Sequence, residues 1–217
     1  MARDDIRVEA IHRALDDAGL DALICALPNN VLLLSGYWPV IGTSLAIATR
    51  EGRVVLIAPD DEVEMAGRAL ADEVRRYQPA PLEEIKQAAD ALWLPLREAA
   101  VDLSIEKGRI GYERGPVSVP GSYVSMYLHG ASIVDLLRRS LPETRLRPAD
   151  DLLANLRARP TPGEVGRIRV ACRMAENAFG EGTRRLREGM KEYEAAALFR
   201  APLMMVDPRS GVQRRPI

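Results

Sequence analysis

The sequence predicts an α/β layered domain over roughly residues 1–150, with a mixed sheet and helices packed against it. Short apolar runs that suit strands alternate with amphipathic segments that suit helices. Two of these runs are close enough in the chain to form a β-hairpin, which makes the sheet mixed. With 217 residues, 47% of them hydrophobic, the chain has room for one large domain, or for one domain and part of another.

The first predicted elements are a helix and a buried strand. Gly19 is placed to end a helix with one apolar face, made by Ile6, Ala10, Ile11, Ala14, Leu15 and Ala18. Residues 21–27 are an apolar run, which predicts a strand buried on both faces. Asn30 is placed to cap a short helical run over residues 31–34.

A hairpin comes next. Residues 45–49 and 53–58 flank a turn in which Gly52 can adopt the positive φ of a tight reversal. We expect a helix over 60–70 and an edge strand over 74–78.

The remaining segments of this domain continue the alternation of strand and helix. We expect strands over 109–113 and 144–147, a helix over 133–139, and a helix from Pro148 to about Leu156. A further amphipathic helix is indicated by Leu82, Ile85, Ala89, Leu92, Trp93 and Leu96.

Residues 157–198 contain two more helices. Thr161 and Glu164 make a capping box, and Pro162 falls at the first helical position. One face of the first helix carries Val165, Ile168, Cys172, Ala175 and Phe179. A second helix is expected over 192–198. Their apolar faces need a sheet or other helices to cover them, so we expect the opening of an incomplete second domain.

Composition excludes several classes of partner. The 30 basic and 31 acidic residues nearly balance, so no field attracts nucleic acid or an anionic membrane. Aromatic residues make up 5% of the chain, which argues against a base-stacking surface. No secretory signal and no membrane-spanning run are present. We expect a cytoplasmic protein in which Cys25 and Cys172 are buried thiols.

Two histidines are the first candidates for catalysis. His12 lies in a charged helix, where a solvated side chain is expected. His129 has Ser122, Ser125 and Asp135 nearby in the sequence, so a serine triad can be imagined. The Gly-x-Ser-x-Gly motif is absent, which favours a packed or capping histidine.

Charged clusters are better explained by helix ends than by ligand sites. Acidic residues in the first turn of a helix complement its partial positive charge, and these are Asp60, Asp61, Glu62 and Glu64. Arginines at the end of a helix satisfy its last carbonyls, and these are Arg184, Arg185 and Arg187. No nucleotide-binding glycine motif is present. Tyr37 and Trp38 differ, because an aromatic pair in a loop often contacts a ligand or partner; packing is the alternative.

Two groups of motifs carry a family resemblance over nearly the whole chain, to about Leu198. The first group is 19–24, 28–31, 34–36, 55–59 and 109–113, and the second is 157–176 and 188–197. In order and spacing they resemble the creatinase/prolidase/aminopeptidase P group of metallopeptidase-like proteins. The resemblance implies a three-layer creatinase-type N-terminal domain with a mixed sheet over 1–156. It also implies the first helices of an incomplete pita-bread catalytic domain over 157–200. Residues 201–217 depart from the family, and we expect a disordered tail left by a frameshift or premature end.

The resemblance also implies a metal chemistry that this chain does not complete. The family holds two divalent metals, such as Mn, Co or Zn, through two aspartates, a histidine and two glutamates. The metals activate a bridging water that attacks the bond before proline. All five ligands follow the point where the resemblance stops, and beyond Leu198 only Asp207 is acidic. We therefore expect no catalytic residue, no metal ligand and no activity in the chain alone.

The expected partners follow from the same resemblance. Relatives use the N-terminal domain to form a dimer and to shape access to a neighbouring subunit's active site. Tyr37 and Trp38 are the candidates for that access wall. We expect a homodimer or association with a full-length relative. A stand-alone, non-catalytic dimerisation or binding module for full-length members is the rival interpretation.

Overall fold

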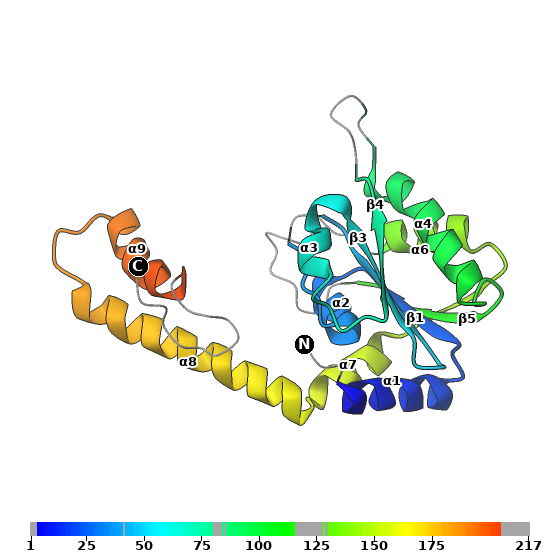
Figure 1. Ribbon diagram of the computed structural model, residues 1–217, viewed down its shortest axis with the longest axis horizontal. Coiled ribbons are helices and arrows are strands. Elements are labelled where there is room, and N and C mark those ends of the chain that lie inside the picture. Colours follow the sequence, from blue (N-terminus) through cyan, green and yellow to red (C-terminus); the bar gives the residue numbers. More distant parts are fainter. Residues whose placement is uncertain are drawn as a thin grey trace. The chain divides into compact units, whose positions relative to one another are not determined.

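The computed structural model describes residues 4–40, 42–79, 84, 86–115, 128 and 130–204. The chain divides into two compact units, Met1–Arg159 and Pro160–Ile217. The first unit is an α/β domain, and the described part of the second contains two helices (Figure 1).

Six strands in the described residues form one mixed sheet with the order β4-β3-β2-β1-β5-β6. They are β1 (Ala22–Cys25), β2 (Leu45–Thr49), β3 (Val54–Pro59), β4 (Glu73–Tyr77), β5 (Arg109–Tyr112) and β6 (Arg145–Pro148). The neighbours β3 and β4, β1 and β5, and β5 and β6 are parallel, whereas β2 is antiparallel to both β1 and β3. The predicted mixed sheet, hairpin and edge strands are confirmed.

Helices cover both faces of the sheet, which makes three layers (Figure 1). One face carries α1 (Asp5–Ala18), α2 (Pro28–Ser35), α3 (Val63–Ala66) and α7 (Asp150–Ala158). The other carries α4 (Ala88–Asp102) and α6 (Ala131–Ser140). Every residue of β1, β2 and β3 is buried between these layers, which explains their uninterrupted apolar sequences. Among the described residues, no helix combines the length and the hydropathy needed to cross a membrane.

Two glycines confirm the predicted turns of this unit. Gly19 ends α1 with a φ of 62°, and Gly52 closes the β2–β3 hairpin with a φ of 80°. Both angles lie in the left-handed region, which glycine adopts without the penalty of a Cβ.

Three predicted helix boundaries are wrong. Asn30 is not a cap, because α2 already begins at Pro28. The helix expected over 60–70 is a 3₁₀ turn, η1 (Asp60–Glu62), followed by the short α3. The chain leaves α3 because the Leu70 N–H donates to the Ser35 carbonyl, at 2.7 Å. Pro148 ends β6 and does not begin a helix.

Helix α4 begins at Ala88, later than the sequence pattern indicates. Leu82 and Ile85, which the pattern assigned to this helix, lie outside the described residues. The buried positions of α4 include the predicted Leu92 and Leu96.

The second unit consists of α8 (Pro162–Arg185) and α9 (Glu192–Met204) in its described part. The predicted capping box of Thr161 and Glu164 is present. The two helices pack through the rings of Phe179 and Phe199, whose centroids are 5.1 Å apart, and α8 buries Gly182 in this unit.

Three expectations for this unit are corrected. Cys172 is exposed, because the face of α8 that carries it, together with Ile168 and Phe179, stays largely uncovered in the described part of this unit. Helix α9 continues past residue 198 and through Pro202, which is buried. Residues 201–204 form the last part of this helix and are not disordered. The rest of the expected tail, 205–217, lies outside the described residues.

Candidate functional site

The carboxyl ends of β1, β3 and β5 lie at one edge of the sheet, because all three strands run in the same direction. Two buried glutamates follow these ends: Glu62 comes after β3, and Glu113 comes directly after β5. In open α/β sheets this edge is the usual place for a binding site. We therefore built the candidate site from these two carboxylates.

Glu62 accepts hydrogen bonds from the segment that carries the predicted aromatic pair. The Tyr37 hydroxyl and the Val40 N–H donate to Oε2, the latter at 2.9 Å. The Gly42 N–H donates to Oε1 at 2.7 Å. Glu62 is only 1% exposed, so three donors from one loop converge on a buried carboxylate.

Tyr37 and Trp38 have opposite positions. Tyr37 is 5% exposed and packs in the core, whereas Trp38 is 52% exposed. Burial, together with the hydrogen bond to Glu62, raises the pKa of Tyr37 well above its usual value. The packing alternative therefore describes Tyr37, and only Trp38 remains available as a surface for another molecule.

Two further contacts fix the rest of this loop. The Tyr77 hydroxyl donates to the Thr43 carbonyl at 2.6 Å. Gly42 approaches Pro59 so closely that a Cβ on residue 42 would lie 2.5 Å from the proline ring. The loop is thus tied to β3, η1 and β4, although it has no regular secondary structure.

Glu113 lies beside β1 at the point where the strand order changes direction. Its Oε1 accepts the N–H groups of Ala26 and Leu27, the latter at 2.6 Å. Its Oε2 accepts a hydrogen bond of 2.5 Å from the side chain of Asn30. Such a switch point, next to a helix N-terminus, is where doubly wound proteins hold anionic ligands. In this chain the carboxylate of Glu113 already fills the position.

Burial raises the pKa of Glu113 to about 7, even though the N–H donors favour the charged form. The nearby Cys25 thiol also has its pKa raised well above the usual value, first by burial and then by the charge of Glu113. Thiols react as thiolates, so this shift makes Cys25 an inert core residue and not a nucleophile.

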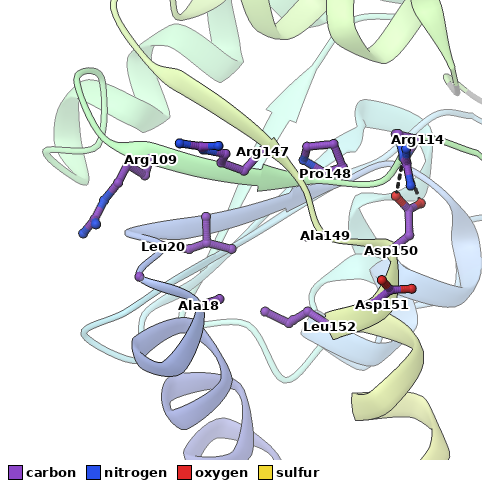
Figure 2. Close-up of a pocket in the computed structure, with 11 residues that line it drawn as sticks. Ala18, Leu20, Arg109, Arg114, Arg147, Pro148, Ala149, Asp150, Asp151 and Leu152 are labelled. Carbon is purple, nitrogen blue, oxygen red and sulfur yellow. Dashed lines mark hydrogen bonds and ion pairs between the residues drawn. The ribbon is translucent and has the colours of Figure 1, made fainter.

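A surface pocket of about 380 Å³ lies over β5 and β6, between the end of α1 and the start of α7 (Figure 2). Arg114 donates to both carboxylate oxygens of Asp150, at 3.0 and 2.9 Å, and lowers the pKa of that carboxyl against the effect of burial. Arg147 has no side-chain partner among the described residues, and Asp151 lines the same pocket. Three arginines and two aspartates line the pocket. Because Arg109 is paired with Asp21 and Arg114 with Asp150, most of the basic charge is already neutralised.

The other sequence candidates do not form a site. His12 contacts the Arg50 carbonyl through Nδ1 and lies 3.3 Å from Asp16, so it is more constrained than expected. His129, Ser122 and Ser125 lie outside the described residues. Arg187 donates to the carbonyls of Arg184 and Leu186, as predicted for arginines at a helix end.

The donor set does not fit a metal ion in the part of the chain that the structure describes. No group of three or more metal-ligating side chains occurs there. In the acidic cluster, Glu62 turns inward to the Tyr37 loop, and the Glu64 side chain is 91% exposed. The expectation that all four acidic residues serve a helix end is therefore wrong for Glu62.

Sequence reasoning missed both buried glutamates as organising residues. A signal existed for Glu113, because a charged residue that follows the apolar positions of a strand closely needs a buried partner. For Glu62 the signal was hidden in an acidic run, and its partner Tyr37 is 25 residues away in the chain.

Comparisons with known proteins agree with the fold. The family model "Creatinase/Prolidase N-terminal domain" matches residues 7–159. A curated relative, the Xaa-Pro dipeptidase of Pyrococcus horikoshii, is 25% identical over 191 residues, which cover 88% of this chain and 45% of the relative.

Solved structures give the same result. The prolidase from Pyrococcus horikoshii OT3 matches with a TM-score of 0.58 and 23% identity, over 92% of this chain and 48% of that chain. The X-Pro aminopeptidase from Thermotoga maritima MSB8 matches with a TM-score of 0.66 and 22% identity, over 94% and 49%. The chain therefore spans about half the length of the relatives it matches. Since the family model covers most of the three-layer unit, the chain belongs to the creatinase/prolidase N-terminal domain family.

Proposed function

We propose that this chain provides the N-terminal, non-catalytic half of an Xaa-Pro peptidase-like metallohydrolase. The observation that carries the proposal is the family match over residues 7–159, in a chain that spans 45% of an Xaa-Pro dipeptidase. In this proposal the 217 residues hold no metal and do not hydrolyse peptides by themselves. The dinuclear Mn, Co or Zn site belongs to a catalytic half, and the cytoplasm is the proposed compartment.

Metal content and peptidase activity test this proposal together. The purified chain is incubated with Mn²⁺, Co²⁺ or Zn²⁺, desalted, and analysed for bound metal by mass spectrometry. Hydrolysis of an Xaa-Pro dipeptide is measured in parallel. We expect less than stoichiometric metal and no turnover above the metal-only background. Metal-dependent turnover that follows the protein through purification contradicts the proposal.

In this proposal the three-layer unit contributes to a dimer and shapes the approach to a neighbouring subunit's active site. Trp38 is the residue assigned to that wall, because it is 52% exposed while Tyr37 beside it is buried. Replacing Trp38 by alanine in a complex with a catalytic half is expected to raise KM for an Xaa-Pro peptide more than it lowers kcat. An unchanged KM removes Trp38 from the wall.

A second candidate function is a stand-alone module that binds full-length family members. The exposed apolar side chains of α8 favour it, since Ile168 is 55% and Phe179 is 68% exposed. The affinity-tagged wild-type chain and an Ile168→Glu variant distinguish the two functions, because Ile168 is exposed and is not the residue through which α8 packs on α9. The module predicts that a co-expressed full-length relative is retained by the wild-type chain and lost by the variant. If the wild-type chain and the variant both fail to retain the full-length relative, the binding-module function is contradicted.

A further inference from the structure

We propose that Glu62 is the positioning residue of the loop whose described residues are 36–40 and 42–43, and that it holds Trp38 and Val40 in one outward-facing arrangement before any partner binds. The inference deepens the proposed function, and its biological meaning rests on that function. The arrangement of the loop itself stands on the contacts of this chain alone.

The loop depends on Glu62 because its backbone lacks the hydrogen bonds of a helix or strand. Residues 37–40 and 42–44 have no regular secondary structure. The N–H groups of Val40 and Gly42 instead donate to the two oxygens of one carboxylate, at 2.9 and 2.7 Å. A carboxylate can accept several such bonds at once, and bonds to a charged acceptor are among the stronger ones. The carboxylate of Glu62 therefore accepts the backbone hydrogen bonds that a neighbouring strand or helical turn would otherwise accept.

Buried and exposed side chains alternate along the loop, so one set faces the domain core and the other faces solvent. Tyr37 is buried on Glu62, and the Gly42 backbone lies against Pro59. Between them Trp38 and Val40 are 52% and 51% exposed. Two large apolar side chains are thus presented to solvent from a backbone that is tied on both sides.

Such an arrangement suits binding better than packing. A loop that is ordered before contact loses less conformational freedom when a partner binds, so more of the contact energy appears as affinity. The partner that fits the proposed function is a second subunit, which meets Trp38 and Val40 as a preformed surface. Glu62 acts through these residues and does not itself touch the partner.

The experiment uses Trp38 as its own reporter. The chain has two tryptophans, so a Trp93→Phe background leaves Trp38 as the only one. In this background the 217-residue chain is compared with Glu62→Gln, Tyr37→Phe and the control Glu64→Gln, whose side chain is 91% exposed in the wild type. Time-resolved anisotropy of Trp38 measures ring motion, and amide hydrogen exchange at Val40 and Gly42 measures loop opening. Exchange in β1 reports global unfolding.

Glu62→Gln is expected to speed exchange at Val40 and Gly42 at least tenfold relative to β1 and to shorten the anisotropy decay of Trp38. Tyr37→Phe removes one of three donors and is expected to give a smaller change in the same direction. Glu64→Gln is expected to match the background protein. If Glu62→Gln lowers protection throughout β1, the variant is globally destabilised. Tyr37→Phe then tests the inference, through its exchange rate at Val40 and Gly42 relative to that in β1. The inference is overturned if folded Glu62→Gln and Tyr37→Phe show the same exchange ratios and the same Trp38 anisotropy decay as the background protein.

A separate measurement keeps this inference apart from the proposed function. Sedimentation equilibrium of the wild-type chain and of Trp38→Ala reports whether a second copy binds through the loop. Loss of self-association in Trp38→Ala supports the role of the loop in a dimer. A monomeric wild-type chain whose loop loosens in Glu62→Gln contradicts the dimer but retains the positioning role. A rigid loop in Glu62→Gln contradicts the positioning role whatever the state of association.

Discussion

The side-chain amide of Asn30 donates a hydrogen bond of 2.5 Å to Glu113, and so joins the first turn of α2 to the residue that follows β5. The carbonyl oxygen of Asn30 in turn accepts from Arg157 on α7. This relay connects three segments on one side of the sheet through a carboxylate that is 1% exposed.

We predict that Glu113 makes the stability of the chain depend on pH. Burial raises the pKa of Glu113 from 4.5 to about 7, so the folded chain keeps a proton that the unfolded chain releases in this interval. The stability that the protonated Glu113 carboxyl gives the folded chain is fully present below about pH 4.5. It is lost as pH rises towards 7, which lowers the free energy of unfolding by about 3 kcal/mol. Urea unfolding at a series of pH values measures this slope.

The matched variants for this prediction are Glu113→Gln and Glu98→Gln, the second on the exposed side of α4. Glu113→Gln is expected to reduce the slope between pH 4.5 and 7, because residue 113 no longer titrates. Glu98→Gln is expected to keep the wild-type slope. Parallel profiles for wild type and Glu113→Gln exclude Glu113 as the source.

Gly111 is predicted to be intolerant of alanine. A Cβ at this position of β5 would lie 2.7 Å from Leu23, 2.8 Å from Leu20 and 3.2 Å from Ala149. Overpacking of this kind costs about 1–3 kcal/mol, and Gly111→Ala is expected to lose that much stability in urea. Gly115→Ala is the control, because no atom of the described residues lies within 4 Å of a Cβ there. Equal stability of the two variants refutes the packing argument.

Gly182 is predicted to set the distance between α8 and α9. A Cβ on residue 182 would lie 2.5 Å from the ring of Phe199, so Gly182→Ala is expected to increase hydrogen exchange in α9. Gly180→Ala, whose Cβ would lie 3.9 Å from Arg184, is expected to stabilise α8 by about 0.5–1 kcal/mol. The second change Phe199→Leu is expected to relieve part of the Gly182→Ala effect. Additive effects of these two substitutions argue against direct contact.

Arg7 is predicted to stabilise the end of α7. It is 5% exposed, and its guanidinium donates to the carbonyls of Leu156 and Arg159 at 2.9 and 3.1 Å. Arg7→Met is expected to cost about 1.5–3 kcal/mol, because hydrogen bonds from a charged donor are lost. Arg13→Met on the same helix, where the side chain is 67% exposed, is expected to change stability by less than about 0.5 kcal/mol. Thermal and urea unfolding compare the two.

Local signals in the sequence predicted most elements of the fold. Uninterrupted apolar runs, period-3.6 patterns, Gly52 at the hairpin turn and the Thr161–Glu164 capping box all depend on residues close in the chain. The boundaries that failed had distant causes. The helix expected up to Leu70 ends early, and the Leu70 N–H donates to the Ser35 carbonyl instead. The Asn30 side chain does not cap a helix, and its amide donates to Glu113.

The sequence by itself determined the α/β class and the order of the elements, because these follow from apolar runs, helical periodicity and turn chemistry. Its motifs, by their order and spacing, carried the family resemblance. Only the tertiary structure decided that Tyr37 is buried while Trp38 is exposed, and that Glu62 and Glu113 are buried carboxylates. The partners of these glutamates lie 25 and 83 residues away. A free energy of burial that depends on such distant partners cannot be worked out from neighbouring residues, even where a charged residue beside an apolar run signals that a partner is needed.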